Sequence, residues 1–199
     1  MLKKFIHYVP LPWIFVILLA SFFFGFSLSP NPETTKEINE DTSGFPQFYM
    51  KNVTTSEFDV NGKLRYQLAT PSISHYQLHL NAPGENDYTL IEQPSLIFHH
   101  EDQAPWIIKA TEGRSEKNGA LIHLLQDVVI SQHSTQQGLV QITTESLLAK
   151  PLEQFVETDK AVKITAEQTQ IDAIGMSADL AASRLQLNSQ VDAVYEPRR

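Results

Sequence analysis

Four consecutive residues, "HHED" at positions 99–102, offer the most tempting combination of side chains for chemistry in this chain. Imidazole and carboxylate groups are common ligands of zinc. A metal site needs ligands that converge on one point, whereas neighbouring residues of a strand point to opposite faces of the sheet. We therefore predict that residues 99–102 form a loop and do not bind a metal.

The other candidates for catalysis are weaker. His75 and His79 have the i, i+4 spacing of two zinc ligands on one helix, but "SISHYQLHL" alternates like a strand and lacks the intervening glutamate of a zinc protease. No serine lies in a G-x-S-x-G turn, and no glycine-rich phosphate loop is present. The sequence therefore predicts no catalytic residue, no metal and no cofactor, and gives an anchored enzyme no support.

The apolar stretch near the N-terminus predicts how the chain is placed in the cell. Residues 8–29 carry no charge and are long enough to cross a membrane as a helix, whereas the apolar core of a cleaved signal spans about 7 to 15 residues. A removed signal, cut after Gly25-Phe26-Ser27, is the less favoured alternative. Lys3 and Lys4 precede the span, so we expect residues 1–7 in the cytoplasm and the rest of the chain outside.

Composition narrows what the exported part can be. Residues 30–44 are rich in Pro, Thr, Glu and Asn and predict a flexible tether, which leaves residues 45–199 as one domain. Acidic residues outnumber basic ones by 23 to 15, which argues against nucleic-acid binding. The chain has no cysteine, so no disulfide supports the fold, which must rest on its own core.

Within this domain, apolar residues alternate with polar ones, as in "LRYQL" and "VKI", which is typical of half-buried strands. The alternating pattern also repeats: the pair Ile108 and Ile130 corresponds to Ile142 and Ile164, and again to Ile171 and Ala193. Stacked repeats share a continuous interior. We therefore expect an all-β fold, an open, twisted roll of antiparallel strands built from about four two-strand units.

The order of the motifs resembles one family. A short basic N-terminus, one apolar span and an acidic tether precede "FYMKNVTTSEFDVNGKLRYQLATPSISHY", "IEQPSLIFHH", "PWIIKATEGRSEKNGALIHLLQDVVI", "ITTESLLAKP" and "IDAIGMSADLAASRLQLNSQVDAVYEP". This order is similar to that of LptC, the single-pass inner-membrane component of the lipopolysaccharide export bridge of Gram-negative bacteria. The resemblance implies a periplasmic β-jellyroll that accepts lipopolysaccharide from the ABC transporter formed by LptB, LptF and LptG and passes it to LptA.

The repeat and the resemblance together predict a lipid-binding interior. The inward repeat positions are Leu68, Leu90, Leu96, Ile108, Ile122, Leu124, Val128, Ile130, Ile142, Val162, Ile164, Ile171, Leu185, Leu187 and Val191. The resemblance adds Val53 near the transporter end and Tyr195 near the outgoing end. It also implies an LptA-facing edge formed by Leu187, Val191, Ala193 and Tyr195.

Ordinary core packing predicts the same alternation, so a second interpretation stays open. In this alternative, the interior is filled, and the protein is a membrane-anchored β-rich scaffold that joins its partners by strand addition without binding lipid.

Overall fold

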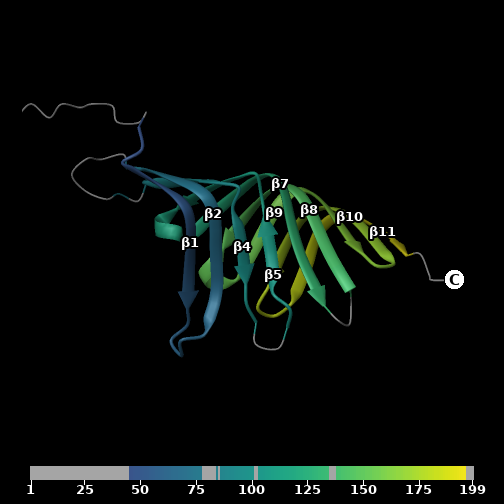
Figure 1. Cartoon of the computed structure of the whole chain (residues 1–199). Helices are drawn as coiled ribbons and strands as arrows, with labels where there is room; N and C mark the ends of the chain where they lie inside the picture. The colour runs from purple at the N-terminus through teal and green to yellow at the C-terminus, as the bar shows by residue number, and fades with distance from the viewer. Residues whose placement is uncertain (1–44, 78–83, 85, 101–102, 135–137, 196–199) are drawn as a thin grey trace, which may run out of the picture. The chain divides into compact units, whose positions relative to one another are not determined.

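The computed structural model describes residues 45–77, 84, 86–100, 103–134 and 138–195 (Figure 1). All of them belong to one unit, Asp41–Arg199. The predicted cytoplasmic segment 1–7, membrane span 8–29 and tether 30–44 lie outside the described residues. Among the residues that are described, no helix has the length and apolar character needed to cross a membrane.

The described residues form one antiparallel sheet, with neighbouring strands lying side by side from β1 to β11 in Figure 1. The all-β antiparallel prediction is therefore confirmed. The strands are β1 (Phe48–Phe58), β2 (Leu64–Tyr76), β3 (Tyr88–Glu92), β4 (Ser95–Phe98), β5 (Trp106–Lys109), β6 (Glu112–Glu116), β7 (Leu121–Ser134), β8 (Gly138–Lys150), β9 (Phe155–Ala166), β10 (Thr169–Asp179) and β11 (Arg184–Tyr195). Two short 3₁₀ turns, η2 (Lys117–Gly119) and η3 (Pro151–Glu153), connect β6 to β7 and β8 to β9.

The connectivity is simpler than the strand labels suggest. β2 pairs with both β3 and β4, and the register continues across the break, from Ser72↔Glu92 to Ala69↔Ser95. β5 and β6 likewise continue one another, because β4 pairs with β5 and β3 pairs with β6. In the described part of the chain, the eleven labelled strands therefore amount to nine bent strands in an up-and-down meander.

Each bent strand changes direction at a similar height, and we call this line the crease. Asn52, Gln126, Asp127, Gly175 and Gln190 lie on it and have positive φ, and the ladders between β7 and β11 shift register close to it. A β-bulge bends a strand and increases its local twist. Bulges at neighbouring positions of β7 to β11, together with the breaks between β3 and β4 and between β5 and β6, therefore bend the sheet into two facing layers.

We name the two layers by their residues. Layer A comprises residues 53–58, 64–70, 95–98, 106–109, 128–134, 138–144, 160–166, 169–174 and 191–195. Layer B comprises residues 48–51, 71–76, 88–92, 112–116, 121–125, 145–150, 155–159, 175–179 and 184–189. The margins of the two layers opposite the crease are formed by the turns between strands.

Gly175 shows why one crease position needs its residue type. Its φ is +77°, a conformation that L side chains rarely adopt, and an added Cβ would lie 2.6 Å from Asn188 Nδ2. Glycine alone meets both demands without strain. The bulge in β10 therefore depends on this residue.

One hydrophobic core lies between the layers. Leu96, Phe98, Ile108, Leu124 and Met176 are fully buried within it. Half-buried apolar residues pack around it, among them Leu68 in β2, Ile171 in β10 and Leu187 in β11. The core is therefore continuous from β2 to β11.

The turn between β1 and β2 is a tight hairpin at Asn61-Gly62. Gly62 has a φ of +79°, and the Asp59 carboxylate accepts hydrogen bonds from the backbone N–H groups of Asn61 and Lys63, at 2.8 and 2.9 Å. The bond from Lys63 is the main reason that the pKa of Asp59 lies below its ordinary 3.8. These bonds favour the charged carboxylate, so their contribution is present above pH 3.8 and is lost as the pH falls through the lowered pKa.

Replacing the Asp59 carboxylate should loosen the β1–β2 hairpin and leave the other ladders unchanged. In Asp59→Ala we expect faster amide hydrogen exchange at Asn61 and Lys63, because both donors lose their acceptor. The wild-type hairpin should show the same loosening only below about pH 3.8. Exchange in the β7–β8 ladder serves as the internal control, and equal protection of Asn61 in both proteins would contradict the capping role.

One inward prediction is wrong. Leu90 is 42% exposed and pairs with Arg114 and Ser74 on the outer face, whereas its neighbour Ile91 is buried. Ile91 lies opposite Gly113, where an added Cβ would come within 3.3 Å of Ile91 Cβ. The missing side chain at 113 leaves room for Ile91 in the interior. The phase changes at Gln93, which lies between β3 and β4 and has a φ of +43°, so β3 is out of phase with the repeat by one residue.

Candidate functional site: a pocket between the two layers

The predicted repeat positions form cross-strand rows on the inner face. One row runs from β2 to β10 through successive Cα partners and reaches Ala193 in β11. Its predicted members are Leu68, Leu96, Ile108, Ile130, Ile142, Ile164 and Ile171. Directly opposite residues in an antiparallel pair share one face of the sheet. The row is therefore a continuous apolar strip along layer A.

The remaining predicted residues lie on the same inner face. Val128 and Val162 are buried near the crease and both pair with Thr144. Ile122 and Leu124 are buried in layer B. Leu187 pairs with Met176, and Leu185 pairs with Ala178. Inner-face residues of both layer A and layer B therefore continue into β10 and β11.

Residues at the two edges are less covered. Val53, in the first strand, is half-buried and pairs with Thr70. In the last strand, Val191 and Tyr195 are 54% and 65% exposed, and the Tyr195 hydroxyl donates to Gln168 Oε1 at 2.9 Å. Among the described residues, β1 pairs only with β2 and β11 only with β10. Within the described part of the chain, both edge strands therefore present a row of backbone groups that no other strand pairs.

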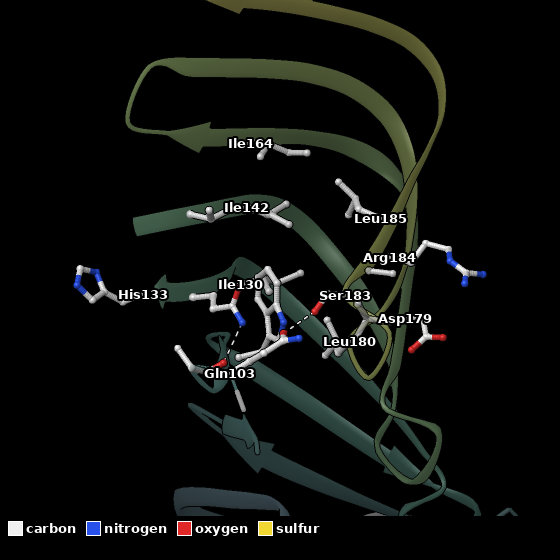
Figure 2. Close-up of a pocket in the computed structure, with 16 residues that line it drawn as sticks. Gln103, Ile130, His133, Ile142, Ile164, Asp179, Leu180, Ser183, Arg184 and Leu185 are labelled. Carbon is white, nitrogen blue, oxygen red and sulfur yellow. Dashed lines mark hydrogen bonds between the residues drawn. The ribbon is translucent and has the colours of Figure 1, made fainter. Parts of the chain in front are cut away.

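A pocket of about 610 Å³ opens between the layers near β7 to β11 (Figure 2). Ile130, Ile142 and Ile164 line it from layer A, and Leu180 and Leu185 from the opposite side. Its volume falls within the range of about 300 to 1,000 Å³ that is typical of ligand sites. The pocket also has the character of such sites, an apolar wall with a few polar groups.

The polar groups gather where the pocket meets the margins of the layers. Ser183 Oγ donates to Gln103 Oε1 at 2.6 Å, and Gln132 Nε2 donates to the Ala104 carbonyl at 2.8 Å. Asp179 and Arg184 also line this side. The pocket therefore grades from an apolar floor to a polar mouth, as an amphipathic ligand requires.

Towards β2, β4 and β5 the interior is filled instead. The Phe98 ring packs against the Tyr66 ring, with centroids 5.9 Å apart, and Leu96 and Ile108 are fully buried beside it. Burial raises the pKa of the Tyr66 hydroxyl above its ordinary 10.0, and the charge of Glu57 adds to this effect. Tyr66 thus stays uncharged near neutral pH, and this part of the interior resembles an ordinary core.

Comparison with family models identifies the family to which this architecture belongs. The model described as "Lipopolysaccharide-assembly, LptC-related" matches residues 13–196, almost the whole chain. The chain belongs to the LptC-related family. As a member of it, the protein is a non-enzymatic component of lipopolysaccharide transport.

Two further comparisons complete this result. A search of curated proteins found no match to this LptC-related chain. Among solved structures, it is similar to LptH of Pseudomonas aeruginosa, described as the LptA-homologous periplasmic component of the lipopolysaccharide transport device. The identity is 9%, the TM-score is 0.44, and the match covers 64% of this chain and 96% of the other.

The sequence pattern missed several interior residues of this LptC-related protein. Phe98 lies two positions after Leu96 on the same face, so strict alternation would have found it. Met176 follows the bulge at Gly175, which shifts the phase of β10 and hides it from the pattern. Trp106 and Leu180 line the pocket from a strand end and a turn, where no repeat position falls.

Proposed function

We propose that this protein carries lipopolysaccharide, with the acyl chains held between layers A and B and the sugars left in water at the polar mouth. The observation that carries the proposal is the unfilled pocket with the apolar wall formed by Ile130, Ile142 and Ile164. Each methylene moved from water to such a wall gains about 0.8 kcal/mol, so area alone favours acyl chains. Membership in a lipopolysaccharide-assembly family supports this choice of ligand.

The two unpaired edges and membership in the LptC-related family together suggest a direction of transfer. We infer that the edge at β1 docks on the transporter formed by LptB, LptF and LptG, and that the edge at β11 docks on LptA. Unpaired strand edges accept strands from partners by backbone hydrogen bonding. With residues 8–29 as an inner-membrane anchor and residues 1–7 in the cytoplasm, the domain 45–199 would stand in the periplasm beside the loading membrane.

A photocrosslinking pair tests the carrier function. With the photoreactive residue at Ile142, which lines the pocket, we expect lipopolysaccharide adducts of the full chain in membranes. With the same residue at Gln141, the adjacent position that points to the opposite face of β8, we expect none. The readout is the fraction of chain shifted to the adduct and detected with an antibody to lipopolysaccharide.

The scaffold alternative predicts a different outcome. If the interior only serves as a core, position 142 should yield no adduct while the chain remains folded and bound to its partners. That result would replace the carrier with a scaffold that joins its partners by strand addition.

A further inference from the structure

The margins of the two layers are tied together by two hydrogen bonds opposite the crease. Gln103, on the layer A margin between β4 and β5, accepts from Ser183, in the layer B turn between β10 and β11, at 2.6 Å (Figure 2). Arg65, at the start of β2 in layer A, donates from Nη2 to the Leu152 carbonyl in the layer B turn η3, at 2.5 Å. We call these two bonds the clasp.

The filled part of the interior limits the routes by which an acyl chain can reach the pocket. Leu96, Phe98, Ile108 and Leu124 have no exposed surface, so in this closed form no acyl chain fits lengthwise from the β1 end to the pocket. Close-packed interiors contain few voids larger than a water molecule. An acyl chain can therefore reach the pocket only if the layers move further apart or if it enters between their margins.

The fold has a line at which the layers can separate. The crease is made of bulged residues with positive φ, and element junctions of this kind absorb changes of backbone angle during hinge motions. Both bonds of the clasp lie at the surface, where water replaces a broken hydrogen bond, so each shifts the closed–open balance by only a few-fold.

We propose that the clasp holds the two layers closed and that its opening admits acyl chains to the pocket through the slit between the margins. This inference rests on the proposed carrier function. It assigns a gating role to Arg65 and to the pair Gln103 and Ser183, which lies at the mouth of the pocket.

The test fixes the clasp shut in the full chain in membranes. The protein has no cysteine, so Gln103→Cys with Ser183→Cys creates a unique thiol pair, which a short, reductant-cleavable thiol crosslinker then joins. With a photoreactive residue at Ile142 as reporter, we expect the tether to lower the lipopolysaccharide adduct at least fivefold and reduction of the tether to restore it. Recovery in the same sample excludes misfolding as the cause.

A matched pair controls for the reagent. Ser131→Cys with Gln141→Cys joins neighbouring strands within layer A, since the two positions are Cα partners, and should leave the adduct unchanged when tethered. Equal adducts with the Gln103–Ser183 tether closed and cleaved would overturn the clasp and leave the carrier function standing. No adduct at Ile142 even without a tether would overturn both.

Weakening the clasp should have the opposite effect on adduct formation at Ile142. Arg65→Ala combined with Ser183→Ala removes both bonds without any reagent, and we expect the initial rate of adduct formation at Ile142 to rise about fivefold. An unchanged rate would show that these bonds do not hold the slit closed.

Discussion

Deletion of residues 191–199 is expected to reduce copurification of LptA to background while the transporter still copurifies. The deletion removes the layer A half of β11, whose outer side pairs with no described strand. We propose this edge as the LptA docking site, and a partner that docks by strand addition depends on the row of backbone groups lost here. The opposite edge at β1, which we propose docks on the transporter, is untouched.

The deletion is placed so that the core survives. Leu187 stays in the chain and keeps its place against the core opposite Met176, whereas the apolar side chains removed, such as Val194 and Tyr195, are more than half exposed. Removal of residues 196–199 alone, which follow β11, is the matched control and should leave LptA bound. Persistence of LptA after the longer deletion would show that β11 is not the docking edge.

Replacement of Phe98 by Ala should cost about 3 to 5 kcal/mol of unfolding free energy. The ring is fully buried between Tyr66 and the rest of the core, so its removal leaves a cavity that the surrounding strands cannot fill. For a domain of this size the loss corresponds to a fall of about 6 to 20 °C in Tm. Thermal unfolding of the purified chain, followed by circular dichroism of the sheet, measures it.

A second variant separates the filled interior from the pocket. Leu185 lines the pocket and is 41% exposed, so Leu185→Ala should cost at most about 1 kcal/mol. Similar losses in the two variants would indicate that the interior is packed uniformly, which would favour the scaffold over the carrier.

The strand class and the inner face were predictable because they depend on local alternation. Ile108 and Ile142 occupy one place in the repeat and Ile130 and Ile164 another, and all four form one row in the structure. A repeat in sequence becomes a row in space when every copy contributes its strands to the same sheet in the same register. The prediction therefore held wherever the strands are regular.

It failed where a single residue changes the phase. Before Gln93, which has a positive φ, Ile91 faces inward and Leu90 outward, and the bulge at Gly175 brings Met176 into the core. A shift of one residue moves every later side chain to the other face. Such shifts depend on partners in other strands, which a pattern within one strand does not contain.

The pocket itself could not be predicted, because its walls come from both layers. Ile142 and Val156 are close in sequence but lie in different layers, and Ala104 joins them from a connection between earlier strands. Their convergence depends on where the sheet folds at the crease. The residues that close the mouth, Gln103 and Ser183, are polar and lie in connections, so no hydrophobic pattern marks them.

Because the number of bent strands is odd, the two edge strands run in the same direction. In the described meander of nine, β1 and β11 both run from layer B to layer A, so the two free edges have the same chain direction. A second copy that continued the trough end to end would have to pair its β1 with β11 in parallel, whereas every ladder within the described residues is antiparallel. Parallel pairing is slightly less stable per residue. Strand direction alone therefore makes end-to-end pairing of two copies slightly less stable than the antiparallel addition of a strand at either edge.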